Sequence, residues 1–248
     1  MNIDFPKVSQ HPALKKLWAE AFGDEEGFIE LFFAAGFSPR RCRCVTVDGE
    51  VAAALYWFDC EGEGGKLAYL YAIATAKAHQ GEGLCRALME DTHALLQKQG
   101  YAGTVLVPAD AGLFAMYTKM GYAAVNCTDT FTCTAAGRCE IRSAAPEEYA
   151  AARSALLPAG GVRQEMGLSY LAGYRELYIG ADFVLAGGRE ASSFTAMELL
   201  GNTAAAPGIL GALGLEEGTF RIPGSEPFAM YRPLSDSPAP NYFGLAFD

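Results

Sequence analysis

Two glycines in the first half of the chain stand where a strand-like segment, 66–75, gives way to an amphipathic segment at about 82–99. Glycines let the backbone turn tightly and present its N–H groups, and a helix start adds a partial positive charge. Such a turn can bind a pyrophosphate group with little help from basic side chains. Alone, glycines before a helix are more often plain turn residues, but the flanking strand and helix favour binding here. The residues of this turn, called the glycine turn below, are Gln80, Gly81, Glu82, Gly83, Leu84 and Cys85.

A second group of candidate residues lies about thirty positions further on. Tyr117 ends a short apolar segment at 111–120, directly before a Lys-Met-Gly-Tyr turn. From its surroundings alone, Tyr117 is a core residue packed beside Phe114, with its hydroxyl hydrogen-bonded. Asp110 precedes the same segment and is placed to cap the start of a helix.

Histidine and cysteine chemistry is not indicated. His11, His79 and His93 form no recognisable motif with a Ser or Cys nucleophile, so we expect surface or capping roles for all three. Cys42 and Cys44 are too close in sequence for a zinc knuckle and are expected to alternate on one face of a strand. With seven cysteines in total, we expect a reduced, cytoplasmic chain without a metal.

The composition excludes several classes of protein. The chain has 248 residues, 51% of them hydrophobic, which is enough for one large core or two small ones. A formal charge of −10 and a pI of about 4.8 argue against nucleic acid as a partner. The apolar stretches are too short to cross a membrane, and the first ten residues do not read as a secretory signal.

The elements of the first part follow from hydrophobic spacing and turn residues. Leu14, Leu17, Trp18 and Phe22 recur at helical spacing, and Asp48-Gly49 between two apolar runs predicts a hairpin. The predicted order is two helices, three strands, a helix, a strand, a helix and two strands. Their ranges are 12–22, 24–35, 44–47, 51–58, 66–75, 82–99, 103–107, 111–120, 122–125 and 128–133.

A change of composition near residue 140 predicts two units, residues 1–137 and residues 138–248, because every Lys and every Cys except Cys139 lies in the first. The second unit partly repeats the element order of the first but has no second glycine turn, so we read it as a degenerate copy. It would shape a substrate cleft or form a dimer surface. The predicted strands are 139–143, 181–187, 194–201, 219–223 and 227–234, and the predicted helices are 146–156, 168–178 and 205–213.

Residues 69–96 and 105–122 together resemble the acetyl-CoA-binding half of the GNAT N-acetyltransferase superfamily. The glycine turn matches the family's pyrophosphate signature except at Cys85, where the family has Gly or Ala. Tyr117 ahead of Lys119-Met120-Gly121-Tyr122 matches the second signature. The resemblance implies a mainly antiparallel, mixed α/β (α+β) sheet flanked by helices, with residues 1–137 as the acetyl-CoA-binding catalytic domain.

The resemblance also implies roles for individual residues. Tyr117 would be the general acid that protonates the thiolate of coenzyme A. Backbone groups of Ile73, Ala74 and Thr75 would bind the pantetheine arm and the acetyl carbonyl. Asp110 stands where many members carry an Asn that contacts that arm, so a cofactor contact and a helix cap are both open.

A base is needed as well, because an ammonium cannot attack until it loses a proton. Family members often use a carboxylate acting through water, which makes Asp59, Glu61 and Glu63 candidates; a solvated loop is the alternative. Tyr69 and Tyr71 alternate on one face of the strand before the glycine turn.

The function expected from the resemblance is transfer of acetyl from acetyl-CoA, as co-substrate, to a primary amine by direct attack and without a metal. The alternative is a non-catalytic acyl-CoA-binding or scaffold protein that keeps the fold. The negative charge slightly favours a cationic small-molecule or peptide acceptor, such as a polyamine, an aminoglycoside or a lysine side chain. Neither nucleic acid nor a membrane is an expected partner, and a homodimer is one alternative for the assembly.

The C-terminal segment 241–248 alternates apolar residues after a proline-rich stretch, which predicts a strand that returns to the body of the protein. If this tail crosses between the two units, Asp248 could serve as base or ammonium anchor at the acceptor site. A strand that only seals the second unit is the alternative.

Overall fold

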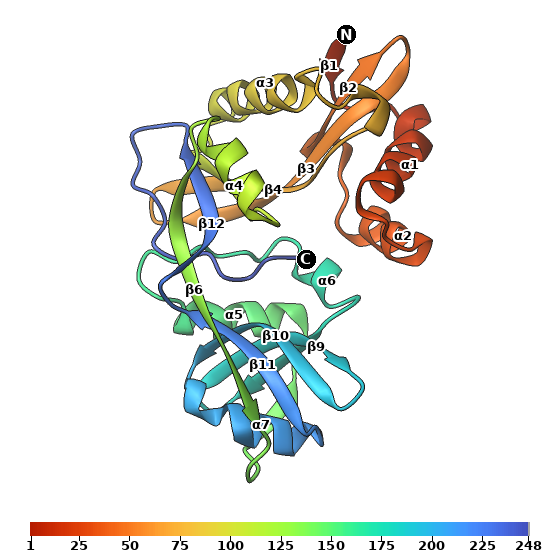
Figure 1. The fold of residues 1–248 in the computed structure, drawn as a ribbon. Coiled ribbons are helices and arrows are strands. Elements are labelled where there is room, and N and C mark those ends of the chain that lie inside the picture. The colour runs from red at the N-terminus through yellow and green to blue at the C-terminus, as the bar shows by residue number, and fades with distance from the viewer. Residues whose placement is uncertain (248) are drawn as a thin grey trace.

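The computed structural model describes residues 1–247, and its twelve strands join one mixed sheet (Figure 1). The strand order is β1-β2-β3-β4-β5-β12-β6-β11-β10-β9-β8-β7. Within the described residues, β4 with β5 and β10 with β11 are the parallel pairs, and the other neighbours are antiparallel. The predicted class, a mainly antiparallel sheet flanked by helices, is confirmed.

The element bounds are as follows. The strands are β1 Asn2–Asp4, β2 Cys42–Val47, β3 Glu50–Gly62, β4 Gly65–Thr75, β5 Gly103–Leu106, β6 Ala123–Thr134, β7 Ile141–Ser143, β8 Glu176–Gly180, β9 Phe183–Glu190, β10 Ser193–Gly201, β11 Glu217–Pro223 and β12 Glu226–Pro233. The helices are α1 His11–Phe22, α2 Glu26–Ala35, α3 Leu84–Lys98, α4 Ala111–Thr118, α5 Pro146–Leu156, α6 Leu168–Leu171 and α7 Ala206–Leu213, with short 3₁₀ turns between some of them. No helix in residues 1–247 is both long and apolar enough to cross a membrane.

The β2–β3 hairpin is confirmed with its two-residue link. Asp48 and Gly49 have φ angles of 50° and 90°, the left-handed conformation that tight hairpin turns require at both central positions. Alternation along β3 then places Tyr56 and Phe58 in the core beneath α1 and α2, and Leu55 and Trp57 in the core beneath α3 and α4. The two helix pairs therefore cover opposite faces of this part of the sheet.

Strands β4 and β5 pair only briefly and then separate. Their parallel register runs from Leu67 opposite Gly103 to Tyr69 opposite Val105. Ala72 has a φ of 48°, and the register of β4 against β3 shifts at the same place. This irregularity is a bulge, which bends the strand that carries it. Beyond Tyr69 the edge of β4 therefore has no strand partner in residues 1–247.

The last part of the chain contributes to the sheet of the first part. Strand β12 pairs with β5 on one side and with β6 on the other. Strand β6 continues past β12 and pairs with β11, so that it links the upper and lower lobes in Figure 1. The division at residue 137 and the interpretation of the second unit as a degenerate copy stay predictions.

Several predicted elements differ from the structure. The two strands expected at 122–125 and 128–133 are one strand, β6, because Asn126 and Cys127 between them also pair with β12. The helix expected at 168–178 stops at Leu171, and 176–180 is strand β8, which pairs with β7 and β9. Strand β1 was not expected at all.

Residues 241–247 contact both β4 and β10, although they do not form a strand. Tyr242 and Phe247 are almost completely buried, and a single bridge to Gly161 is the only strand-like pairing in 241–247. The Tyr242 hydroxyl donates to Glu198 of β10 at 3.0 Å, and the backbone oxygen of Phe247 accepts from Tyr71 of β4 at 2.8 Å. The prediction for Asp248 lies outside the described residues.

Candidate active site

A cavity of about 410 Å³ opens where β4 leaves β5. One wall is the bulged part of β4, the second is the end of β5 with α4, and the third is the α1–α2 pair. Its fourteen lining residues are Trp18, Phe22, Asp24, Phe28, Tyr69, Leu70, Tyr71, Ala72, Ile73, Leu106, Val107, Ala109, Leu113 and Tyr117. Tyr69 and Tyr71 both belong to it.

Tyr117 lines this cavity from α4. Its side chain is 6% exposed and packs against Tyr122, with ring centroids 5.7 Å apart. Burial, followed by the nearby Cys85 thiol, raises the pKa of Tyr117 well above its ordinary value, so the phenol stays protonated at neutral pH. The hydroxyl, predicted to be hydrogen-bonded in a core role, has no hydrogen-bond partner among residues 1–247. A neutral phenol without a partner is suited to donate a proton to a ligand.

The glycine turn leads from β4 into α3. Gly81 and Gly83 have φ angles of 82° and 79°, and a side chain at either position would meet no protein atom within 4 Å. No side chain caps the start of α3, which begins at Leu84 rather than at the predicted position 82. The backbone donors of the first helical turn are therefore not used by a capping side chain, as an anion site requires.

Side chains of the glycine turn mostly hold its shape. Gln80 donates to the backbone oxygen of Thr75 at 3.4 Å, and His79 Nδ1 lies 3.0 Å from Glu82 Oε2. Cys85 is partly buried in the first turn of α3, and burial raises the pKa of its thiol. That Gln80, Gly81, Glu82, Gly83, Leu84 and Cys85 bind a cofactor stays a prediction.

Asp110 caps α4, which agrees with one of its two predicted roles. Its Oδ1 atom accepts a hydrogen bond from the Leu113 backbone N–H at 2.8 Å.

Ile73, Ala74 and Thr75 form the end of β4 beyond the bulge, where β5 has turned away. Their outer backbone edge therefore faces no strand, which leaves it available to a ligand.

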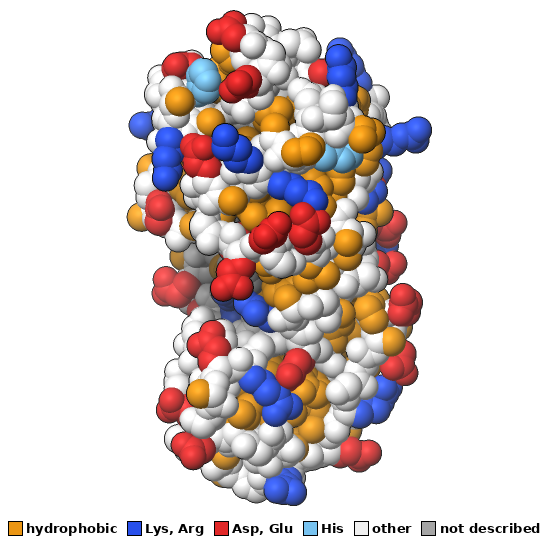
Figure 2. Space-filling view, turned by 90° about the vertical axis from the view of Figure 1, so that its right-hand side faces the viewer, with side chains coloured by type: hydrophobic (Ala, Val, Ile, Leu, Met, Phe, Trp, Pro, Cys, Tyr) orange, Lys and Arg blue, Asp and Glu red, His pale blue; other side chains and the backbone are white. Residues whose placement is uncertain are grey.

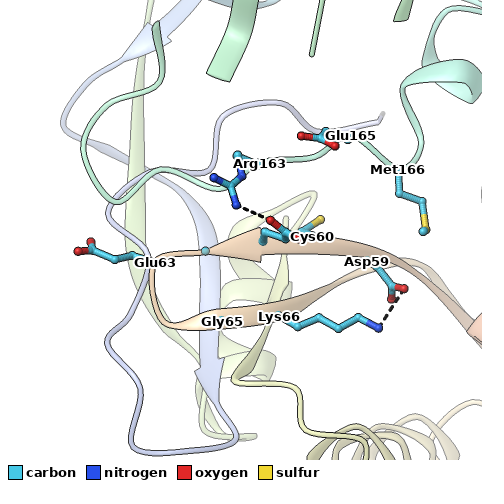
Figure 3. A pocket seen from close by; sticks show the side chains of 10 residues that line it. Asp59, Cys60, Glu63, Gly65, Lys66, Arg163, Glu165 and Met166 are labelled. Carbon is cyan, nitrogen blue, oxygen red and sulfur yellow. Dashed lines mark hydrogen bonds and ion pairs between the residues drawn. The ribbon is translucent and has the colours of Figure 1, made fainter. Parts of the chain in front are cut away.

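The acidic residues expected to include a base lie elsewhere. Asp59, Glu61 and Glu63 line a separate cavity of about 600 Å³ at the far end of the β3–β4 hairpin, which shares no lining residue with the first. Lys66 reaches toward Asp59 (Figure 3), and its Nζ atom lies 3.1 Å from Asp59 Oδ2. Arg163 pairs with Glu61. This position favours the alternative, a solvated loop, because the hairpin turn carries the run away from the diverging strands.

The carboxylate that does line the active-site cavity is Asp24, which sequence reasoning did not single out. It lies between α1 and α2, and its Oδ2 atom accepts from Trp18 Nε1 at 2.7 Å. In the sequence it is one of three consecutive acidic residues at a predicted helix start, and no local signal distinguishes it from Glu25 or Glu26.

His93 is not a surface residue, contrary to prediction. It is 3% exposed, and Arg232 of β12 donates to its Nδ1 at 2.8 Å. Arginine can only donate, so His93 is neutral and its Nε2–H donates to the Tyr122 hydroxyl, also at 2.8 Å. Burial, followed by the charge of Arg232, lowers the pKa of His93 to about 3. This contact ties β12 to the α3 and α4 layer behind Tyr117.

The diverging strands, the glycine turn and the cavity-lining tyrosine define the class of the protein. A family model described as "Acetyltransferase (GNAT) domain" matches residues 2–125. The chain therefore belongs to the GNAT acetyltransferase family, whose chemistry is acyl transfer. None of the curated proteins matches the sequence.

Solved structures share the fold over nearly the whole chain. A GCN5-related N-acetyltransferase from Anabaena variabilis has a TM-score of 0.75 at 13% identity, covering 94% of this chain and 73% of that one. One from Kribbella flavida has a TM-score of 0.69 at 17% identity, covering 94% and 70%. Eis1 from Mycobacterium abscessus has a TM-score of 0.68 at 14% identity, covering 94% and 74%.

Proposed function

We propose that the protein transfers an acetyl group from acetyl-CoA to a primary amine. The observation that carries the proposal is the unpartnered hydroxyl of Tyr117, on a buried side chain that lines the cavity where β4 and β5 diverge. In the reaction the amine nitrogen attacks the thioester carbonyl, the carbon–nitrogen bond forms and the carbon–sulfur bond breaks. The leaving thiolate takes its proton from Tyr117.

The glycine turn would hold the cofactor's pyrophosphate. Open space around Gly81 and Gly83 and the uncapped start of α3 support this placement, because phosphate oxygens need direct access to backbone N–H groups. The unpaired edge of Ile73, Ala74 and Thr75 would bind the pantetheine arm in the manner of a neighbouring strand. Acetyl-CoA supplies the activated acyl group, and the chain's own residues position it.

Tyr117→Phe tests catalysis against simple binding. The substitution keeps the ring packing and removes only the hydroxyl, so acetyl-CoA affinity and stability should be preserved. Loss of a general acid should lower turnover, followed as thiol release from acetyl-CoA, about 100-fold. A matched control is Tyr149→Phe, because the Tyr149 hydroxyl is also without a partner among residues 1–247 but lies in α5, outside the cavity.

The control variant should turn over at the wild-type rate. Wild-type turnover by Tyr117→Phe would contradict the assigned role. Binding of acetyl-CoA with no thiol release for any amine would favour the alternative, a protein that binds an acyl-CoA without catalysis.

A further inference from the structure

The walls of the active-site cavity are aromatic. Trp18, Phe22 and Phe28 line it from the α1–α2 pair, and Tyr69 and Tyr71 line it from β4. Trp18 lies 5.7 Å from both Phe22 and Tyr71, measured between ring centroids. Phe22 is 46% exposed, which is unusual for a large apolar side chain in this protein. Such walls favour a flat or extended apolar ligand.

A single charge lies among these rings. Asp24 is the one charged side chain of the fourteen that line the cavity. One of its oxygens is fixed by Trp18 Nε1 at 2.7 Å, and the carboxylate has no ion-pair partner among residues 1–247. The free oxygen can accept a hydrogen bond from one ammonium group, and the neighbouring aromatic faces add cation–π attraction.

Among residues 1–247, no carboxylate other than Asp24 lines this cavity. The face that carries α1 and α2 shows acidic and basic side chains scattered among hydrophobic ones (Figure 2). A second or third ammonium on the ligand would therefore meet aromatic walls, with no further carboxylate from residues 1–247 to pair with. Placing a charge there without a partner carries a large desolvation cost.

Building on the proposed acetyl transfer, we propose that the acceptor is a primary amine with one positive charge on an apolar body, such as an arylalkylamine. The class differs from the polyamines and aminoglycosides that the net charge alone favours. Asp24 holds the ammonium through its free oxygen while the rings of Trp18, Phe22 and Tyr71 contact the apolar body. The acyl group approaches from the side of Tyr117.

The step balances in protons and electrons. The ammonium passes one proton to Asp24 and then to solvent, and the free lone pair attacks the thioester carbonyl. As the carbon–sulfur bond breaks, the nitrogen loses a second proton, Tyr117 protonates the thiolate, and water returns a proton to Tyr117. The net change is ammonium plus acetyl-CoA to amide, free thiol and one proton.

Steady-state thiol release with matched amines tests this inference. We expect kcat/KM for 2-phenylethylamine to exceed that for spermidine and for kanamycin by at least about tenfold. Asp24→Asn should raise KM for 2-phenylethylamine at least about tenfold, on the scale of one charge-assisted hydrogen bond, and leave acetyl-CoA affinity unchanged. Glu25→Gln is the control, because it removes the same charge one residue away, outside the cavity lining, and should leave KM unchanged.

The outcomes separate this inference from the function on which it rests. Faster turnover of spermidine or kanamycin, or an unchanged KM in Asp24→Asn, would overturn the acceptor class while leaving acetyl transfer intact. Acetyl-CoA binding without thiol release for every amine would overturn both.

Discussion

Gly83→Val tests the glycine turn, and the chain provides a matched control at the other end of the same helix. Gly83 precedes α3 with a φ of 79°, and Gly100 follows α3 with the same φ. A side chain at either position meets no protein atom within 4 Å. The backbone strain of a valine in the left-handed region should therefore be alike, about 1–2 kcal/mol of stability in each variant.

The two variants should differ in cofactor affinity. A branched side chain at Gly83 would occupy the space through which phosphate oxygens approach the first N–H groups of α3. Losing one or two charge-assisted hydrogen bonds of about 1.5–3 kcal/mol each raises the Kd for acetyl-CoA about tenfold to a hundredfold or more. Gly100→Val should bind acetyl-CoA as the wild type does.

The assay is isothermal titration of each folded variant with acetyl-CoA, combined with urea unfolding to confirm that stability falls equally. Equal affinities in Gly83→Val and the wild type would refute the assignment of the glycine turn. An equal loss of affinity in Gly100→Val would show that strain in α3, rather than blocked access, causes the effect.

Two further predictions concern stability. His93 is neutral in the fold with a pKa of about 3 but ionises near 6.5 when unfolded, so its contribution is complete above pH 6.5 and is lost as pH falls toward 3. His93→Gln should therefore reduce the drop in unfolding free energy between pH 7.5 and 5.5 by about 1.4 kcal/mol, and an unchanged drop in urea melts would contradict this. Deleting residues 241–248 removes the buried side chains of Tyr242, Phe243, Leu245 and Phe247. The free energy of unfolding should fall by at least about 4 kcal/mol, and the fraction that still folds should keep its turnover. A stable truncated protein that binds acetyl-CoA but no longer turns over would instead assign the tail a functional role, and an unaffected enzyme would refute both interpretations.

Much of the structure of residues 1–137 could be predicted because it depends on residues close together in the sequence. The Asp48-Gly49 hairpin and the Asp110 cap each depend on residues a few positions apart, and both are confirmed. The family signatures around Gly83 and Tyr117 were recognisable for the same reason, because each occupies one turn of chain.

Features that depend on distant parts of the chain could not be predicted. His93 is buried by Arg232, 139 residues away, and β12 inserts between β5 and β6 although it follows the second unit. Asp24 reaches the active-site cavity only because α1 and α2 fold against β4, whereas local sequence favoured Asp59, which lies in the other cavity. A single sequence carries little local signal for such contacts.

The central claim is that acyl transfer takes place where β4 and β5 diverge, beside Tyr117. A crystal structure of the protein with bound acetyl-CoA tests it most directly. We predict the pyrophosphate on the N–H groups that follow Gly83, and the thioester sulfur within hydrogen-bonding reach of the Tyr117 hydroxyl, directly or through one water. Acetyl-CoA bound with its thioester outside this cavity would contradict the account.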